Sequence, residues 1–275
     1  TKQKITLNKN NETSTWKNDD LPFTNHVQLL EFLKHPENPK ENSFTYATLT
    51  APAGQGKSRL LLKLKDIYKS KGWDCGYALF DPQEGESAFV ESLLRDLGIP
   101  PKNMPQNKNL GKEFYEQYTK KKKGRKKPLV LFVDTLGNIT KNELWLLDYN
   151  FIEDLDNYVR DDEYFEQPGK YRLFLAGRNI SGDLVDSHNP EKYVDFKLSP
   201  FNYEDVLEMV ISNNMFGRLK REAKADFVAD ILYLSGGHPG LMAKIINRYE
   251  DEGINRKGFV ENYVREFWNF DLANT

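Results

Sequence analysis

The chain has 275 residues, of which 39% are hydrophobic and 29% charged, and its formal net charge is -2. This length fits one large or two small domains, and the near-neutral balance argues against a chain devoted to nucleic acid or to an anionic membrane surface. No apolar run approaches the roughly 20 residues that cross a bilayer, and the single cysteine, Cys75, cannot form an internal disulfide. We expect a soluble, cytoplasmic protein without a membrane partner.

Residues 1–20 are polar and predict a loose N-terminal arm. Beyond them, hydrophobic periodicity predicts strands that alternate with helices. The predicted helices are Val27–Leu33, the segment after Lys57, Ser87–Leu97 and Leu146–Val159. The predicted strands are Phe44–Leu49, Trp73–Phe80, Pro128–Val133, Tyr171–Ala176 and Val194–Leu198. Alternation of this kind predicts βαβ units and an α/β domain built on a parallel sheet.

From about Asn202 onward the pattern changes to apolar stripes of helical period, with no further strand. We place a domain boundary near Ser199-Pro200. The predicted organisation is a polar arm at residues 1–20, an α/β domain at 21–199 and a small helical, lid-like domain at 200–275.

The segment Ala51–Ser58, APAGQGKS, matches the phosphate-loop pattern GxxxxGK followed by Ser or Thr, with Ala in place of the first Gly. It follows a predicted strand and opens a predicted helix, so backbone N–H groups and the helix N-terminus can hold an anion. Lys57 then reaches the β- and γ-phosphates, and the Ser58 hydroxyl binds Mg²⁺. We expect ATP or ADP with Mg²⁺ to be bound by Ala51, Pro52, Ala53, Gly54, Gln55, Gly56, Lys57, Ser58 and Arg59.

Two further residues end predicted strands. Asp134 follows the apolar run LVLFV, where a carboxylate in a phosphate-loop protein binds Mg²⁺. Arg178 ends YRLFLAGR, at the edge where ligands bind in parallel sheets. We take Lys57, Asp134 and Arg178 as the candidate catalytic residues, and Ser58 and Asp134 as the metal ligands. Because Thr135, and not Glu, follows Asp134, the activity to expect is a slow ATPase.

With these elements in order, the chain resembles the STAND class of signal-transduction ATPases, relatives of the AAA+ proteins that include NACHT and NB-ARC modules. The resemblance extends from about Pro22 to Glu250. Besides the phosphate loop, LSGGHPGL at Leu234–Leu241 looks like the glycine-x-proline motif of the family's helical domain, and KLSPF at Lys197–Phe201 looks like the segment that joins its two subdomains.

The resemblance also implies roles for single residues. The proline that packs near adenine corresponds to Pro239, and the strand-end arginine that senses the γ-phosphate corresponds to Arg178. FTNHVQLLEFL looks like the nucleotide-entry segment, with Thr24, Asn25 and His26 in place of Gly-Arg-Glu, which makes His26 a candidate adenine contact.

As a whole, the resemblance implies a three-layer P-loop NTPase core whose nucleotide state controls the arrangement of its domains and its self-association into homo-oligomers. It places sensor and effector domains outside this chain, and it suggests a role in prokaryotic defence or signalling.

Other functions remain open at this stage. A small-molecule phosphotransferase uses the same loop, but no arginine-rich lid pattern is present in residues 200–275. An AAA+-like ATPase acting on nucleic acid is supported by KKKKGRKK at Lys120–Lys127, although a solvated loop is the favoured interpretation of this run and nucleic acid is not the expected partner. No Asn-Lys-x-Asp motif favours GTP. Cys75 is expected in the core, and His238 in a helix turn.

Overall fold

The computed structural model describes residues 44–102, 104, 109–122, 126–136, 147–167, 169–178, 180, 193–212 and 221–252. The chain divides between Ser199 and Pro200 into two compact units, an α/β unit and a helical unit. The predicted N-terminal arm and the predicted helix Val27–Leu33 lie outside the described residues. None of the helices in the described ranges combines the length and apolar character that crossing a bilayer requires.

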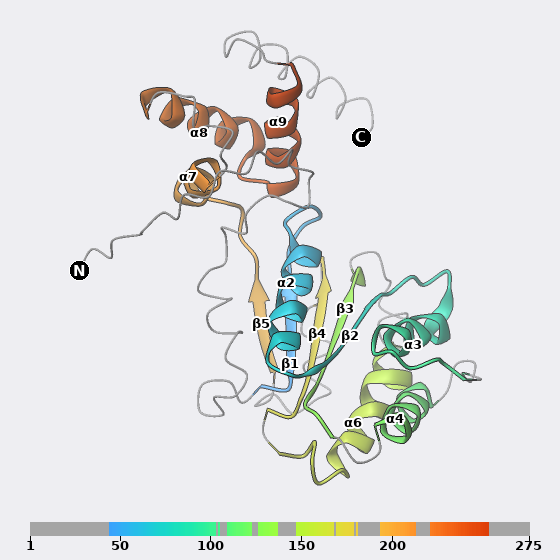
Figure 1. The fold of residues 1–275 in the computed structure, drawn as a ribbon. Helices are drawn as coiled ribbons and strands as arrows, with labels where there is room; N and C mark the ends of the chain where they lie inside the picture. Colours follow the sequence, from blue (N-terminus) through green and yellow to red (C-terminus); the bar gives the residue numbers. More distant parts are fainter. Residues whose placement is uncertain are drawn as a thin grey trace. The chain divides into compact units, whose positions relative to one another are not determined.

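Five parallel strands form the sheet of the α/β unit, in the order β2-β3-β4-β1-β5 (Figure 1). Each predicted strand is present, so the prediction of a parallel sheet is confirmed. Because all the strands point the same way, their carboxyl ends meet at one edge. The bounds are β1 Tyr46–Thr50, β2 Asp74–Leu79, β3 Leu129–Asp134, β4 Tyr171–Gly177 and β5 Tyr193–Lys197.

Helices pack on both faces of this sheet (Figure 1). Alternate residues of a strand face opposite sides, and β3 is buried along its whole length because both faces are covered. Leu131 belongs to the core shared with α3, α4, the π-helix η3 and α6, whereas Phe132 contacts Tyr68 of α2. The predicted three-layer core is therefore present. The bounds are α2 Lys57–Ser70, α3 Gly85–Asp96, α4 Leu110–Lys121, η3 Asp148–Glu153 and α6 Asp154–Arg160.

Helix α4 was not expected from the sequence, where the lysines at its end read as part of a loop. Its apolar residues Leu110, Phe114 and Tyr118 are spaced four apart and are buried against the rest of the core. Lys120 and Lys121 complete its last turn, where cations complement the helix dipole. The lysine run is therefore partly helical.

Cys75 lies on β2 and is 3% exposed, as its core assignment predicts. Burial raises the pKa of its thiol to about 12. The thiol therefore stays protonated near neutral pH, which argues against a role as a nucleophile.

The described part of the helical unit consists of three helices: α7 Tyr203–Ser212, α8 Arg221–Ser235 and α9 Pro239–Glu252. The buried residues that they share are Val206, Met209, Val210, Phe227, Val228, Ile231, Met242, Ile245 and Ile246. The segment before α7 is fastened to the turn before α9, since the Phe201 N–H donates to the Gly237 carbonyl at 2.8 Å.

Candidate functional site

The candidate site lies at the carboxyl edge of the sheet, where three strands end side by side. β4 is inserted between β1 and β3, and it pairs Gly177 with Thr50 and Leu175 with Val133. The Ala51 N–H, at the start of the phosphate loop, donates to the Gly177 carbonyl at 3.2 Å. The loop, Arg178 and Asp134 are therefore brought to the same edge, although they are far apart in the sequence.

Two glycines give the phosphate loop its shape. Gly54 has φ 74° and Gly56 has φ 84°, both in the left-handed region that favours glycine. Gly56 forms the N-cap of α2, and its carbonyl accepts the Leu60 N–H at 2.9 Å. A Cβ added at Gly56 would meet no atom within 4 Å, so the backbone angle, and not crowding, requires glycine here. Left-handed residues before a helix make the concave anion nest that a phosphate loop needs.

Lys57 is the first residue of α2 and turns back over the loop. Its Nζ donates to the Ala51 carbonyl at 2.6 Å and to the Pro52 carbonyl at 2.7 Å. Burial lowers the pKa of the Lys57 ammonium, the Asp134 carboxylate acts to raise it, and the Arg178 guanidinium lowers it further. The charges of Asp134 and Arg178 both act on the Lys57 ammonium.

Asp134 is 2% exposed, and hydrogen bonds hold both of its carboxylate oxygens. Oδ1 accepts the N–H of Thr135 at 2.7 Å, and Oδ2 accepts the Tyr77 hydroxyl at 2.9 Å. Thr135 is exposed and has φ 72°, which is unusual for a non-glycine residue. Sequence reasoning identified Asp134 but missed Tyr77, because the two are 57 residues apart and only the pairing of β2 with β3 brings them together.

The oxygen atoms of Asp134 and Ser58 suit Mg²⁺. Carboxylate and hydroxyl oxygens are hard ligands, and Mg²⁺ is usually held by one or two of them together with phosphate oxygens and water. Ser58 is exposed at the start of α2. Within the described ranges, no group of three or more His, Cys, Asp or Glu side chains could hold a metal without such help. The donor set fits a metal that arrives with a nucleotide.

The remaining predicted loop residues differ in exposure. Pro52, Ala53 and Gly54 are exposed, Arg59 is partly exposed, and Ala51 is buried at the end of β1. Gln55 is only 5% exposed, and its Oε1 has no hydrogen-bond partner within the described part of the chain. The Gln55 side chain is therefore turned into the protein.

The two predicted adenine contacts, Pro239 and His26, lie outside the described part of the α/β unit. Pro239 begins α9 and is partly buried within the helical unit. His238 accepts the Leu241 N–H on its Nδ1 at 3.2 Å, which agrees with its interpretation as a helix-turn residue. His26 lies outside the described residues.

Comparison with known proteins supports the fold. No family model matches the chain, and no curated protein does. Among solved structures it is similar to Cdc6p from Pyrobaculum aerophilum, with 19% identity over 85% of this chain and 64% of that chain and a TM-score of 0.53. A Thermotoga maritima RuvB variant has 13% identity over 89% and 69%, with a TM-score of 0.50. Drosophila ORC bound to DNA has 11% identity over 95% and 70%, with a TM-score of 0.52.

The chain spans 64–70% of the length of these three proteins. At such identities the similarity establishes the fold and transfers no residue roles. The parallel sheet with its phosphate loop after β1 has the fold of the AAA+ P-loop ATPases.

Proposed function

We propose that this chain is an ATP-binding module of the STAND type, in which the bound nucleotide controls the arrangement of the two units and the self-association of the protein. The observation that carries the proposal is that strand pairing brings the segments of Asp134 and Arg178 to the same edge of the sheet as the glycine-shaped loop and Lys57. Lys57 and the loop N–H groups would hold the phosphates, and Asp134 with Ser58 would hold Mg²⁺. The resemblance to STAND proteins supports a role in signalling or defence.

Thr135 favours holding nucleotide over rapid turnover. It is exposed directly after Asp134, and its hydroxyl is no general base for the attacking water. Hydrolysis is therefore proposed to be slow, so that the bound state persists long enough to act as a signal.

Arg178 is proposed to distinguish ATP from ADP. A charge-assisted hydrogen bond to the γ-phosphate is worth about 1.5–3 kcal/mol, which corresponds to about 10- to 100-fold in affinity. Moving a two-state equilibrium from 1:99 to 99:1 takes about 10⁴-fold. The Arg178 contact alone is therefore too weak to switch the arrangement of the two units. Lys57 and the Mg²⁺ ligands must also bind ATP more tightly in one arrangement than in the other.

Sedimentation velocity with Mg²⁺ plus ATP, ADP or no nucleotide tests this function. We expect the wild type to change its sedimentation coefficient or oligomeric state with ATP only. Arg178→Ala should lose about 10-fold or more of the preference for ATP over ADP, because the γ-phosphate loses its guanidinium. Arg95→Ala, which removes an exposed arginine paired with Glu91 on α3, is the matched control. Identical sedimentation of the wild type under all three conditions would contradict the switch.

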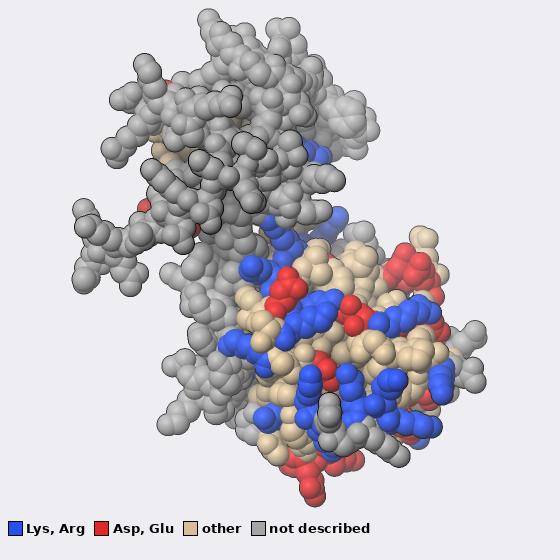
Figure 2. Space-filling model, viewed as in Figure 1, with Lys and Arg blue, Asp and Glu red and all other residues tan. Residues whose placement is uncertain are grey.

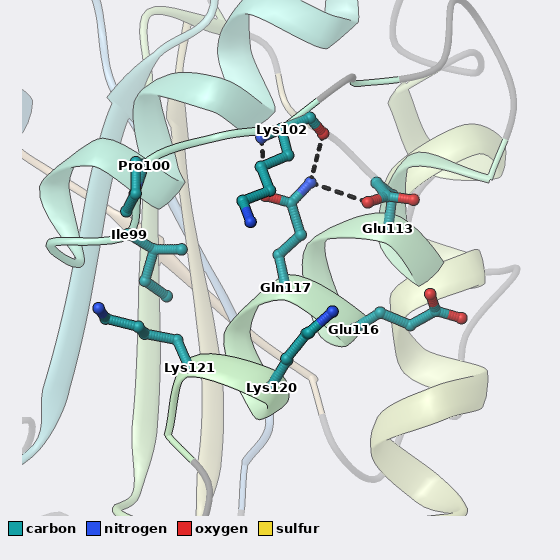
Figure 3. A pocket seen from close by; sticks show the side chains of 8 residues that line it. All are labelled: Ile99, Pro100, Lys102, Glu113, Glu116, Gln117, Lys120 and Lys121. Atoms are coloured by element: carbon teal, nitrogen blue, oxygen red, sulfur yellow. Dashed lines mark hydrogen bonds between the residues drawn. The ribbon is translucent and has the colours of Figure 1, made fainter.

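A second candidate, an ATPase that acts on nucleic acid, is favoured by the surface over α4, where lysine side chains gather (Figure 2). A hollow of about 320 Å³ lies there. Gln117 of α4 holds the backbone of Lys102 at the rim of this hollow. The Gln117 side-chain oxygen accepts the Lys102 N–H at 2.9 Å, and the side-chain NH₂ donates to the Lys102 carbonyl at 2.7 Å. The residues that line it are Ile99, Pro100, Lys102, Glu113, Glu116, Gln117, Lys120 and Lys121 (Figure 3).

The lysines of this surface are of two kinds. Lys122 pairs with Asp74 at 3.2 Å and Lys126 with Asp162 at 2.7 Å, so these two neutralise largely buried carboxylates. Lys120 and Lys121 have no ion-pair partner within the described ranges and are exposed. Because only part of the run is available to a polyanion, we rank this function second.

Salt-dependent DNA binding tests this second function. If this function holds, replacing both Lys120 and Lys121 by Ser should make the negative slope of log affinity against log salt shallower by about 2, since each phosphate contact contributes about 0.9. Replacing Lys63, an exposed lysine of α2, with Ser is the control. Fluorescence anisotropy with a labelled duplex gives the measurement, and an unchanged slope would exclude this surface.

A further inference from the structure

Asp134 is connected to the helix that carries the phosphate loop by a short chain of polar contacts. Lys65 of α2 donates to Asp96 Oδ1 at 2.7 Å, and Asp96 Oδ2 accepts the Tyr77 N–H at 2.7 Å. The Tyr77 hydroxyl then donates to Asp134 Oδ2 at 2.9 Å. This chain joins α2, α3, β2 and the end of β3.

Tyr77 is held in place before its hydroxyl meets Asp134. Among the described residues β2 is the edge strand of the sheet, so no neighbouring strand there accepts its outward N–H groups. Asp96 supplies the missing acceptor for Tyr77, and the Lys65 ammonium lies 5.7 Å from the centre of the Tyr77 ring. Backbone and ring are both fixed, so the direction of the hydroxyl is fixed too.

The Tyr77 hydroxyl donates one hydrogen bond to the Asp134 carboxylate. With Thr135 N–H on Oδ1, each oxygen of Asp134 accepts one hydrogen bond, which fixes the rotation of the carboxylate. The remaining lone pairs are the ones available to a metal or its water ligands.

We propose that Tyr77 is a positioning residue for the metal site, orienting the Asp134 carboxylate toward Mg²⁺. The inference rests on the proposed nucleotide binding and adds a residue to it. Groups that orient a metal ligand usually contribute about 10- to 100-fold to metal affinity. Removing the Tyr77 hydroxyl therefore weakens the Mg²⁺-dependent part of nucleotide binding and leaves the Mg²⁺-free part unchanged.

Titration calorimetry of ATP with Tyr77→Phe, in Mg²⁺ and in EDTA, tests the inference. We expect the gain in affinity that Mg²⁺ brings to fall about 10-fold, while affinity in EDTA stays within about twofold. Tyr118→Phe is the matched control, because its hydroxyl donates to Asp74 Oδ2 at 3.0 Å in the same way but away from the loop. It should change neither affinity.

Two further variants sharpen the result. In an Asp134→Ala background the change Tyr77→Phe should have no additional effect, since its target is gone. Lys65→Met removes the cation above the ring and keeps the hydroxyl, so it should show the same selective loss at smaller size even if Tyr77→Phe folds poorly. Equal losses with and without Mg²⁺, or no loss, would overturn the role of Tyr77 and leave nucleotide binding standing. Failure of the wild type to bind ATP would overturn both.

Discussion

Lys57→Ala is expected to weaken ATP binding by at least about 100-fold, or ~2.7 kcal/mol. The Lys57 ammonium is the charged donor at the mouth of the loop, where it bonds the Ala51 and Pro52 carbonyls at 2.6 and 2.7 Å. Phosphate oxygens are stronger acceptors than these carbonyls, and charge-assisted hydrogen bonds to them are correspondingly strong. Without the ammonium, only the loop N–H groups and the start of α2 remain to hold the phosphates.

The folded structure should survive this change. Burial removes water from the Lys57 ammonium and lowers its pKa, which means that the fold disfavours the charged form. Removing this charge should therefore cost the fold little stability. Alanine also has the highest helix propensity. Lys63→Ala, at an exposed position of the same helix, is the matched control for titration calorimetry and thermal melting. Tight ATP binding by Lys57→Ala, with a melting temperature near that of the wild type, would remove the basis of the nucleotide-binding assignment.

The strands were predictable because burial on both faces leaves a continuous apolar run. Leu129–Val133 and Leu173–Ala176 are such runs, and both lie in strands of the structure. Helix α4 was missed because only three large apolar side chains, Leu110, Phe114 and Tyr118, form its buried face and Gly111 interrupts the pattern. Gly111 has a packing reason: a Cβ there would lie 2.2 Å from the Leu155 backbone nitrogen, so only glycine lets α4 approach α6 this closely.

The grouping of the candidate site residues at one edge was predictable where the residues are adjacent in sequence or end a strand. The phosphate loop is local, and parallel topology brings the ends of β1, β3 and β4 to one edge. Tyr77 could not be predicted, because its partner is chosen by strand pairing. Arg172 is a similar case: it is fully buried in β4, with its guanidinium 4.3 Å from the Phe44 ring centre and bonded to the Tyr68 hydroxyl at 2.8 Å. Sequence alone does not reveal such an aromatic environment.

The largest effect on stability is expected at the turn before α9. Gly237 has φ 75°, and a Cβ added there would lie 2.1 Å from the Phe201 carbonyl oxygen. Gly237→Ala therefore carries the cost of a left-handed alanine, about 1 kcal/mol, plus about 2 kcal/mol or more for the overlap with a backbone atom. Relief of the overlap would also lengthen the hydrogen bond from the Phe201 N–H to the Gly237 carbonyl. This hydrogen bond fastens the start of α7 to the turn.

Gly236→Ala separates the two costs, because Gly236 also has a positive φ, of 57°, but a Cβ there meets no atom within 4 Å. Hydrogen exchange of peptides from α7–α9 suits a chain with two units, since it reports local opening where a single unfolding free energy is undefined. Exchange should accelerate by about 5-fold in Gly236→Ala and by more than about 100-fold in Gly237→Ala, with the strands of the α/β unit unaffected. Equal acceleration in both variants would mean that the turn shifts to accommodate the added methyl group. The contact with Phe201 would then not hold in place the turn that precedes Pro239, the first residue of α9.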